Sequence, residues 1–133
     1  MSVVLAVGLD RLCHDVLTET IDERSEPVTV VTCSDARTAR NWLGERGSET
    51  PVMIIAAFRE HEAWSLSALF TRLRSRALGD RTELVLVSEL PAVALPVLIT
   101  DVSGLHTVLS GSGMELRHHL NQTFPDQLAA SAS

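Results

Sequence analysis

Val3-Val4-Leu5-Ala6-Val7 is a continuous apolar run of strand length close to the start of the chain. A run that does not alternate with polar residues is typical of a parallel strand covered by helices on both faces. Asp10 follows at the position of a helix N-cap. After it come apolar residues at helical spacing: Leu12, Cys13, Val16, Leu17 and Ile21. The first 21 residues therefore predict a buried strand and an amphipathic helix.

The same strand–helix unit recurs four more times along the chain. Further strands are expected at residues 28–32, 52–57, 84–87 and 105–109. Further helices are expected after a cap at Ser34 or Asp35, at residues 62–77, at residues 91–100 with an interruption at Pro96, and from a capping box made by Ser112 and Glu115. Because crossovers between parallel strands are right-handed, this (βα)5 pattern predicts an α/β doubly wound parallel sheet with the flavodoxin-like strand order 2-1-3-4-5.

Length and composition limit the class of protein. A chain of 133 residues fits one domain, expected at residues 1–124, and the alanine- and serine-rich residues 125–133 are expected to be a linker or disordered tail. No apolar run approaches the roughly 20 residues of a membrane helix, and no signal peptide is recognisable, so a cytoplasmic location without membrane contact is expected. The formal net charge of -6 disfavours direct binding to nucleic acid.

The chain contains no lysine, since all 11 basic side chains are arginine. Mechanisms that require a lysine, such as those of P-loop nucleotide hydrolases and Schiff-base enzymes, are therefore excluded.

Two segments carry a resemblance to a known family. Val31-Thr32-Cys33-Ser34-Asp35-Ala36, before a helix, looks like the second strand and helix of a response-regulator receiver. Gly104-Leu105-His106-Thr107-Val108-Leu109-Ser110 looks like the segment around the lysine of the fifth receiver strand. With matching element lengths over residues 3–124, the chain resembles the receiver (CheY-like) domains of bacterial two-component systems.

The resemblance fails at the residues on which receiver phosphorylation depends. A phosphorylated receiver needs an acidic pair for Mg²⁺, a phosphoryl-accepting aspartate and a lysine. The corresponding positions hold Gly8 and Leu9 for the acidic pair, Ala56, Ala57 and Phe58 for the aspartate, and Gly111 for the lysine, while Ser88 keeps the hydroxyl that ends the fourth strand. A serine at a strand end is common, so Ser88 alone indicates no function. The resemblance therefore implies a degenerate pseudo-receiver that is not an enzyme and needs no cofactor or metal.

Pseudo-receivers of this family act as protein-interaction or dimerisation modules. The resemblance implies that the chain pairs with itself, with an output domain or with a partner protein. The larger signalling protein would be a transcription antiterminator, a DNA-binding regulator or a pilus-localisation ATPase.

An uncharged segment indicates where such contacts would form. Residues 90–100 contain no charged side chain, so a helix there would lack the polar outer face of an ordinary surface helix. The expected interface residues are Pro91, Val93, Ala94, Val97, Leu98 and, in the fifth strand, Val108.

Two alternatives remain open. The first is a small-molecule or redox-sensing flavodoxin-like domain, with its ligand at the carboxyl ends of the strands. The second follows from Cys33-Ser34-Asp35-Ala36-Arg37, which resembles the C-x-D-x-R motif of β-class carbonic anhydrases. No cysteine follows Cys33 to complete a zinc site, so a strand end and a helix cap explain this segment better.

The remaining polar residues favour structural roles. The histidines, His14, His61, His106, His118 and His119, suggest no catalytic set and are expected to be solvated or to cap helices. Arg72, Arg74 and Arg76 lie at the end of the predicted third helix, where positive charge suits the helix dipole.

Overall fold

The computed structural model describes residues 2–23, 28–45, 50–75, 81–96, 99, 105–109 and 113–123. The strands are β1 (Ser2–Val7), β2 (Val28–Cys33), β3 (Met53–Ala57), β4 (Glu83–Val87) and β5 (Leu105–Leu109). The helices are α1 (Arg11–Asp22), α2 (Ala36–Glu45), α3 (Ala63–Arg74) and α5 (Met114–Thr123), with short 3-10 helices η1 (Glu60–Glu62) and η3 (Ala92–Ala94). The predicted tail at residues 125–133 and the cap at Ser112 lie outside the described residues.

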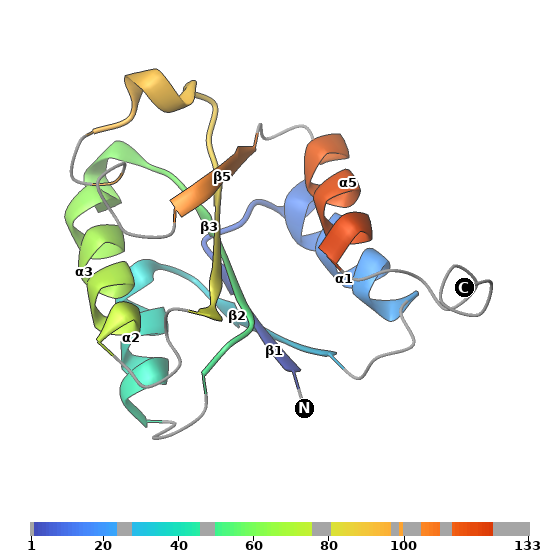
Figure 1. Cartoon of the computed structure of the whole chain (residues 1–133), viewed down its shortest axis with the longest axis horizontal. Coiled ribbons are helices and arrows are strands. Elements are labelled where there is room, and N and C mark those ends of the chain that lie inside the picture. The colour runs from blue at the N-terminus through green and yellow to red at the C-terminus, as the bar shows by residue number, and fades with distance from the viewer. Residues whose placement is uncertain are drawn as a thin grey trace.

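The five strands form one sheet in the order β2-β1-β3-β4-β5, and every neighbouring pair is parallel. This confirms the predicted doubly wound, flavodoxin-like fold. The helices α2 and α3 cover one face of the sheet, and α1 and α5 cover the other (Figure 1). A parallel sheet needs such cover because both of its faces are apolar.

Alternate residues of the central strands enter two separate hydrophobic clusters. Leu5 of β1 and Ile54 of β3 pack on the α2–α3 side, whereas Val4 and Ile55 pack on the α1–α5 side. All four are fully buried. The alternation follows from the two-residue period of a strand, and it fixes the position of the strand ends relative to both helical layers.

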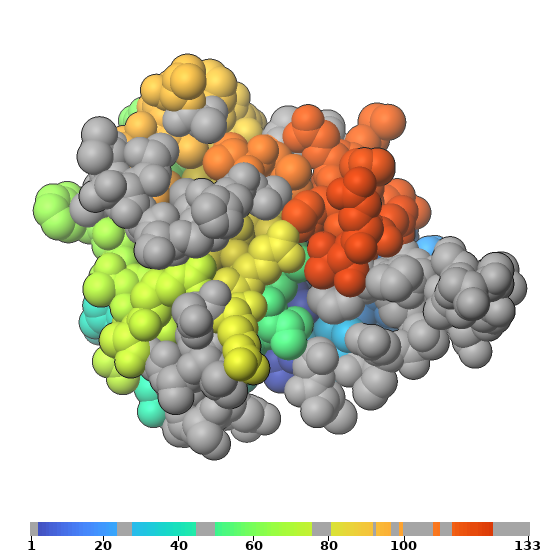
Figure 2. All heavy atoms as spheres, in the orientation of Figure 1, coloured from blue at the N-terminus to red at the C-terminus, as the bar shows by residue number. Residues whose placement is uncertain are grey.

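The segment after β4, where a helix interrupted at Pro96 is predicted over residues 91–100, is irregular in its described part. That part contains the 3-10 helix η3 and the helical residue Ile99, whose N–H donates to the carbonyl of Pro96. Pro96 has no N–H and crowds the carbonyl four residues before it, so a regular helix cannot run through it without distortion. In Figure 2 the residues around η3 form a projection at the top of the molecule, beside those of β5.

The edge strand β5 pairs irregularly with β4. Leu84 pairs with Leu105, but the next residue, Val85, pairs with Thr107, so His106 is an extra residue in β5. This is the pattern of a β-bulge.

Among the described residues, none of the helices has the length and apolarity needed to span a membrane.

Candidate functional site

The loop after β1 occupies the place of a receiver's acidic pair. Gly8 has a left-handed φ of 63°, and its N–H donates to the carbonyl of Cys33 at 2.8 Å. A Cβ at position 8 would lie 2.8 Å from Nη1 of Arg59. Leu9 packs against the cluster on the α1–α5 side. Neither Gly8 nor Leu9 has a side-chain oxygen that could bind a cation.

The end of β3 likewise carries no phosphoryl acceptor. Ala56 is fully buried, and Ala57 is partly buried. Phe58 packs against the core on the α2–α3 side while its N–H donates to the carbonyl of Val87 at 2.8 Å. The first charged side chain after β3 is Arg59, a cation where a receiver has anions.

Ser88, at the end of β4, has a local structural role. Its side chain is almost completely buried, and its Oγ accepts a hydrogen bond from the N–H of Leu90 at 3.0 Å. Its own N–H donates to the carbonyl of Leu109 at 2.8 Å. These bonds fix the turn that leaves β4 and agree with the interpretation of Ser88 as a strand-end residue. Gly111, the position of the receiver lysine, lies outside the described residues.

A hollow of about 380 Å³ lies at the carboxyl ends of β1, β3 and β4. Its apolar lining includes Leu9, Phe58 and Leu90. Its polar lining consists of Arg59, Ser88 and three acidic residues, Asp10, Glu60 and Glu89. Arg59 Nη1 is 3.6 Å from Oε2 of Glu62 in a half-exposed ion pair. Sequence reasoning missed Arg59, although its place directly after the third apolar strand was available as a signal.

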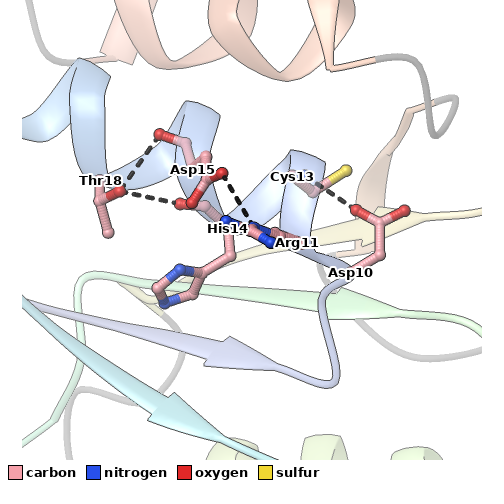
Figure 3. A network of polar contacts seen from close by, with 6 residues as sticks. All are labelled: Asp10, Arg11, Cys13, His14, Asp15 and Thr18. Carbon is pink, nitrogen blue, oxygen red and sulfur yellow. Dashed lines mark hydrogen bonds and ion pairs between the residues drawn. The ribbon is translucent and has the colours of Figure 1, made fainter.

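Asp10 caps the N-terminus of α1 (Figure 3). Its Oδ1 accepts from the N–H of Cys13 at 2.8 Å, which confirms the predicted N-cap. In the same turns Arg11 and Asp15 approach to 3.9 Å, and the hydroxyl of Thr18 donates to the carbonyl of His14 at 3.1 Å. This polar network is explained by helix capping and helix-surface pairing.

The two cysteines are buried thiols on opposite faces of the sheet. Burial, reinforced by Asp10, raises the pKa of Cys13 from 9.0 to about 11. Burial, reinforced by Asp35, also raises the pKa of Cys33. Because they belong to different clusters, the two thiols cannot form a disulfide with each other while the sheet is intact. The raised pKa values of the two thiols and their separation by the sheet both argue against a redox-sensing domain.

Residues 33–37, which resemble the C-x-D-x-R motif, run from the end of β2 into the N-terminus of α2. Oδ1 of Asp35 accepts hydrogen bonds from the N–H and the hydroxyl of Thr38, both at 2.8 Å. These bonds, helped by nearby Arg37, lower the pKa of the Asp35 carboxyl. Cys33 faces the core. In the part of the chain that the structure describes, no group of three or more histidine, cysteine or acidic side chains could hold a metal ion.

The described histidines form local pairs. Nε2 of His14 lies 2.9 Å from Oγ1 of Thr32, and Nε2 of His119 is paired with Oε1 of Glu83. His118 is exposed and contacts Gln122, four residues later. The side chain of His106 is not among those described. The Thr32 hydroxyl beside His14 lies on the exposed surface of β2, and neither residue lines the hollow at the strand ends.

Of the residues predicted as an interface, Pro91, Val93 and Ala94 are exposed, whereas Val108 is partly buried. The Val93 side chain is 95% exposed, Leu90 is 37% exposed, and Pro91 and Ala94 are also exposed. Val108 of β5 is partly buried against the α2–α3 cluster. Val97 and Leu98 lie outside the described residues. We call Leu90, Pro91, Val93 and Ala94 the Val93 face.

No protein-family model matches the chain, and no curated protein sequence matches it.

Proposed function

We propose that the chain is a non-catalytic pseudo-receiver that mediates protein–protein contact, first of all homodimerisation, within a larger cytoplasmic regulatory protein. The observation that carries the proposal is the Val93 face, where a 95% exposed valine stands among uncharged neighbours on a projection of the molecule. Isolated exposed apolar residues are common, but a contiguous uncharged patch often marks an interface.

The carboxyl edge of the sheet supports the non-catalytic part of the proposal. Aspartyl-phosphate chemistry needs carboxylates for Mg²⁺ and for the phosphoryl group, and the described positions 8, 9 and 56–58 provide none. The total absence of lysine removes the last member of the receiver set. A CheY-like fold that lacks the residues for phosphorylation fits a function in surface recognition best.

Sedimentation velocity of Val93→Glu tests the proposed interface. At about 100 μM the unmodified protein should sediment as a dimer, and the variant as a folded monomer, because a charge at the centre of an apolar interface must be desolvated there. Val52→Glu is the control, since Val52 is 39% exposed just before β3, at the amino ends of the strands, whereas η3 follows the carboxyl end of β4. The proposal would be contradicted if the unmodified protein were monomeric at this concentration. It would also be contradicted if Val93→Glu dimerised as well as Val52→Glu.

The hollow at the strand ends favours a second candidate function, small-molecule sensing. Its volume of about 380 Å³ and its mixed lining suit a small amphiphilic ligand. Native mass spectrometry should then detect a bound molecule that is lost in Ala57→Phe, which narrows the hollow. Native protein that carries no adduct, in buffer or from cell extract, would remove this candidate.

A further inference from the structure

The helices α2 and α3 cover the face of the sheet away from α1 and α5 (Figure 1). A shallow groove with a volume of about 440 Å³ lies on their outer surfaces. We call it the α2–α3 groove. Its principal lining residues are Arg40 from α2 and Trp64, Ser67, Ala68, Thr71 and Arg72 from α3.

The shape of the groove follows from the sequence of α3. The helix turns Leu66, Leu69 and Leu73 into the core, so positions 64, 67, 68, 71 and 75 form the opposite stripe. This stripe extends over about 16 Å at 1.5 Å per residue. Small side chains between Trp64 and Ser75 keep its floor low, so the groove is long and shallow.

The charges in the groove have one sign. Arg40 and Arg72 are exposed, and within the described residues neither takes part in an ion pair. By contrast, Arg74 on the same helix donates to the carbonyl of Thr82 at 3.2 Å. Among the described residues no carboxylate lines the groove, although the chain has 17 acidic residues and 11 basic ones. The hydroxyls of Ser67 and Thr71 can add hydrogen bonds to an anion held by the guanidinium groups.

Trp64 adds an apolar surface at the start of the stripe. Its side chain is 79% exposed, unusually high for the largest apolar residue. Tryptophan and arginine are enriched among the hot-spot residues of protein interfaces, because both contribute large contact areas and directional hydrogen bonds.

We propose that the α2–α3 groove binds an acidic peptide segment of a partner protein. Carboxylates of the segment pair with Arg40 and Arg72, and an apolar side chain of the segment packs on Trp64. A groove of about 16 Å accommodates about five extended residues, which fits a peptide better than a single compact anion. This site lies apart from the Val93 face and does not depend on homodimerisation.

Fluorescence anisotropy with a labelled octapeptide of glutamate and leucine tests the proposal. At low salt the unmodified protein should bind this peptide, and the peptide with glutamine in place of glutamate should bind at least about tenfold more weakly. The double variant Arg40→Glu, Arg72→Glu should lose about tenfold or more in affinity, and Trp64→Ala should lose a few-fold. The matched control is Arg11→Glu, Arg117→Glu, which changes the net charge equally on the α1–α5 side.

Each contrary result overturns the proposal. Absence of binding at about 1 mM peptide would show that the groove does not recognise carboxylates. An equal loss in the control variant would show only a response to net charge. Tighter binding of a single-stranded oligonucleotide would assign the groove to nucleic acid. If the groove variant changes the sedimentation of the protein alone, the occupant is a second copy. Circular dichroism checks that the exposed substitutions leave the fold intact.

Discussion

Three consecutive residues after β1 have three different structural roles. Gly8 adopts a left-handed backbone, Leu9 packs on the core and Asp10 caps α1. A side chain at position 8 would be strained and would displace the guanidinium of Arg59. An acidic side chain at position 8 would therefore disturb the loop.

The Asp10 cap gives a residue-scale prediction. Asp10→Ala leaves the N–H of Cys13 without its acceptor and should lower the free energy of unfolding by about 1 kcal/mol. Asp15→Ala, which removes only an exposed 3.9 Å ion pair with Arg11, should change it much less. Urea denaturation of both variants makes the comparison. Equal losses would mean that the Asp10 bond does not contribute as a cap.

The buried thiols predict a loss of stability in alkali. Because the pKa of Cys13 is raised from 9.0 to about 11 in the folded state, the unfolded chain loses this proton first. Between these two pH values the folded state binds more protons, so the free energy of unfolding should fall as the pH rises. The chain has no lysine or tyrosine to obscure the effect. In the variant Cys13→Ala, Cys33→Ala this pH dependence should flatten. An unchanged slope would contradict the assignment.

At the scale of elements, α3 has a buried face and an exposed face. Leu69→Ala removes a fully buried side chain and should cost about 3 kcal/mol. Leu12→Ala on α1, where the leucine is 54% exposed, should cost less than about 1 kcal/mol. Thermal and urea denaturation would test both values. A small loss at Leu69 would mean that α3 is loosely packed.

The strands and most helices could be predicted because their signals are local. Apolar runs gave β1 to β5 within about one residue, and Asp10 and Asp35 cap α1 and α2 as expected. The third helix, predicted at residues 62–77, begins one residue later because Glu62 belongs to η1, and it ends at Arg74 with Ser75 as its C-cap. The helix predicted at residues 91–100 was expected to be interrupted at Pro96, and its described start is the short 3-10 helix η3.

The candidate sites were less accessible to prediction. The absence of carboxylates at residues 8, 9 and 56–58 could be read from the sequence, because these positions follow recognisable strands. The α2–α3 groove could not, because Arg40 and Trp64 are far apart in the chain and meet only when two helices pack side by side. The spacing of Trp64, Ser67, Ala68 and Thr71 was the available signal, and it is also that of an ordinary helix surface.

At the scale of the whole molecule, the chain keeps the architecture of a receiver without its reactive groups. Incubation with acetyl phosphate and Mg²⁺ should therefore add no mass and leave the sedimentation coefficient unchanged. Intact-protein mass spectrometry provides the readout, with a functional receiver as the positive control. A stable phosphoryl group on any aspartate would refute the non-catalytic assignment.

The extra residue in β5 also affects how copies of the molecule can meet. An edge strand offers unpaired backbone groups to any other chain with an exposed strand, which is a route to amyloid-like aggregation. The shift of register at His106 lies in the pairing of β5 with β4, and a bulge of this kind bends the strand and increases its twist. A bent edge strand is a poorer template for a second strand, so we expect contacts at this edge to be made by side chains.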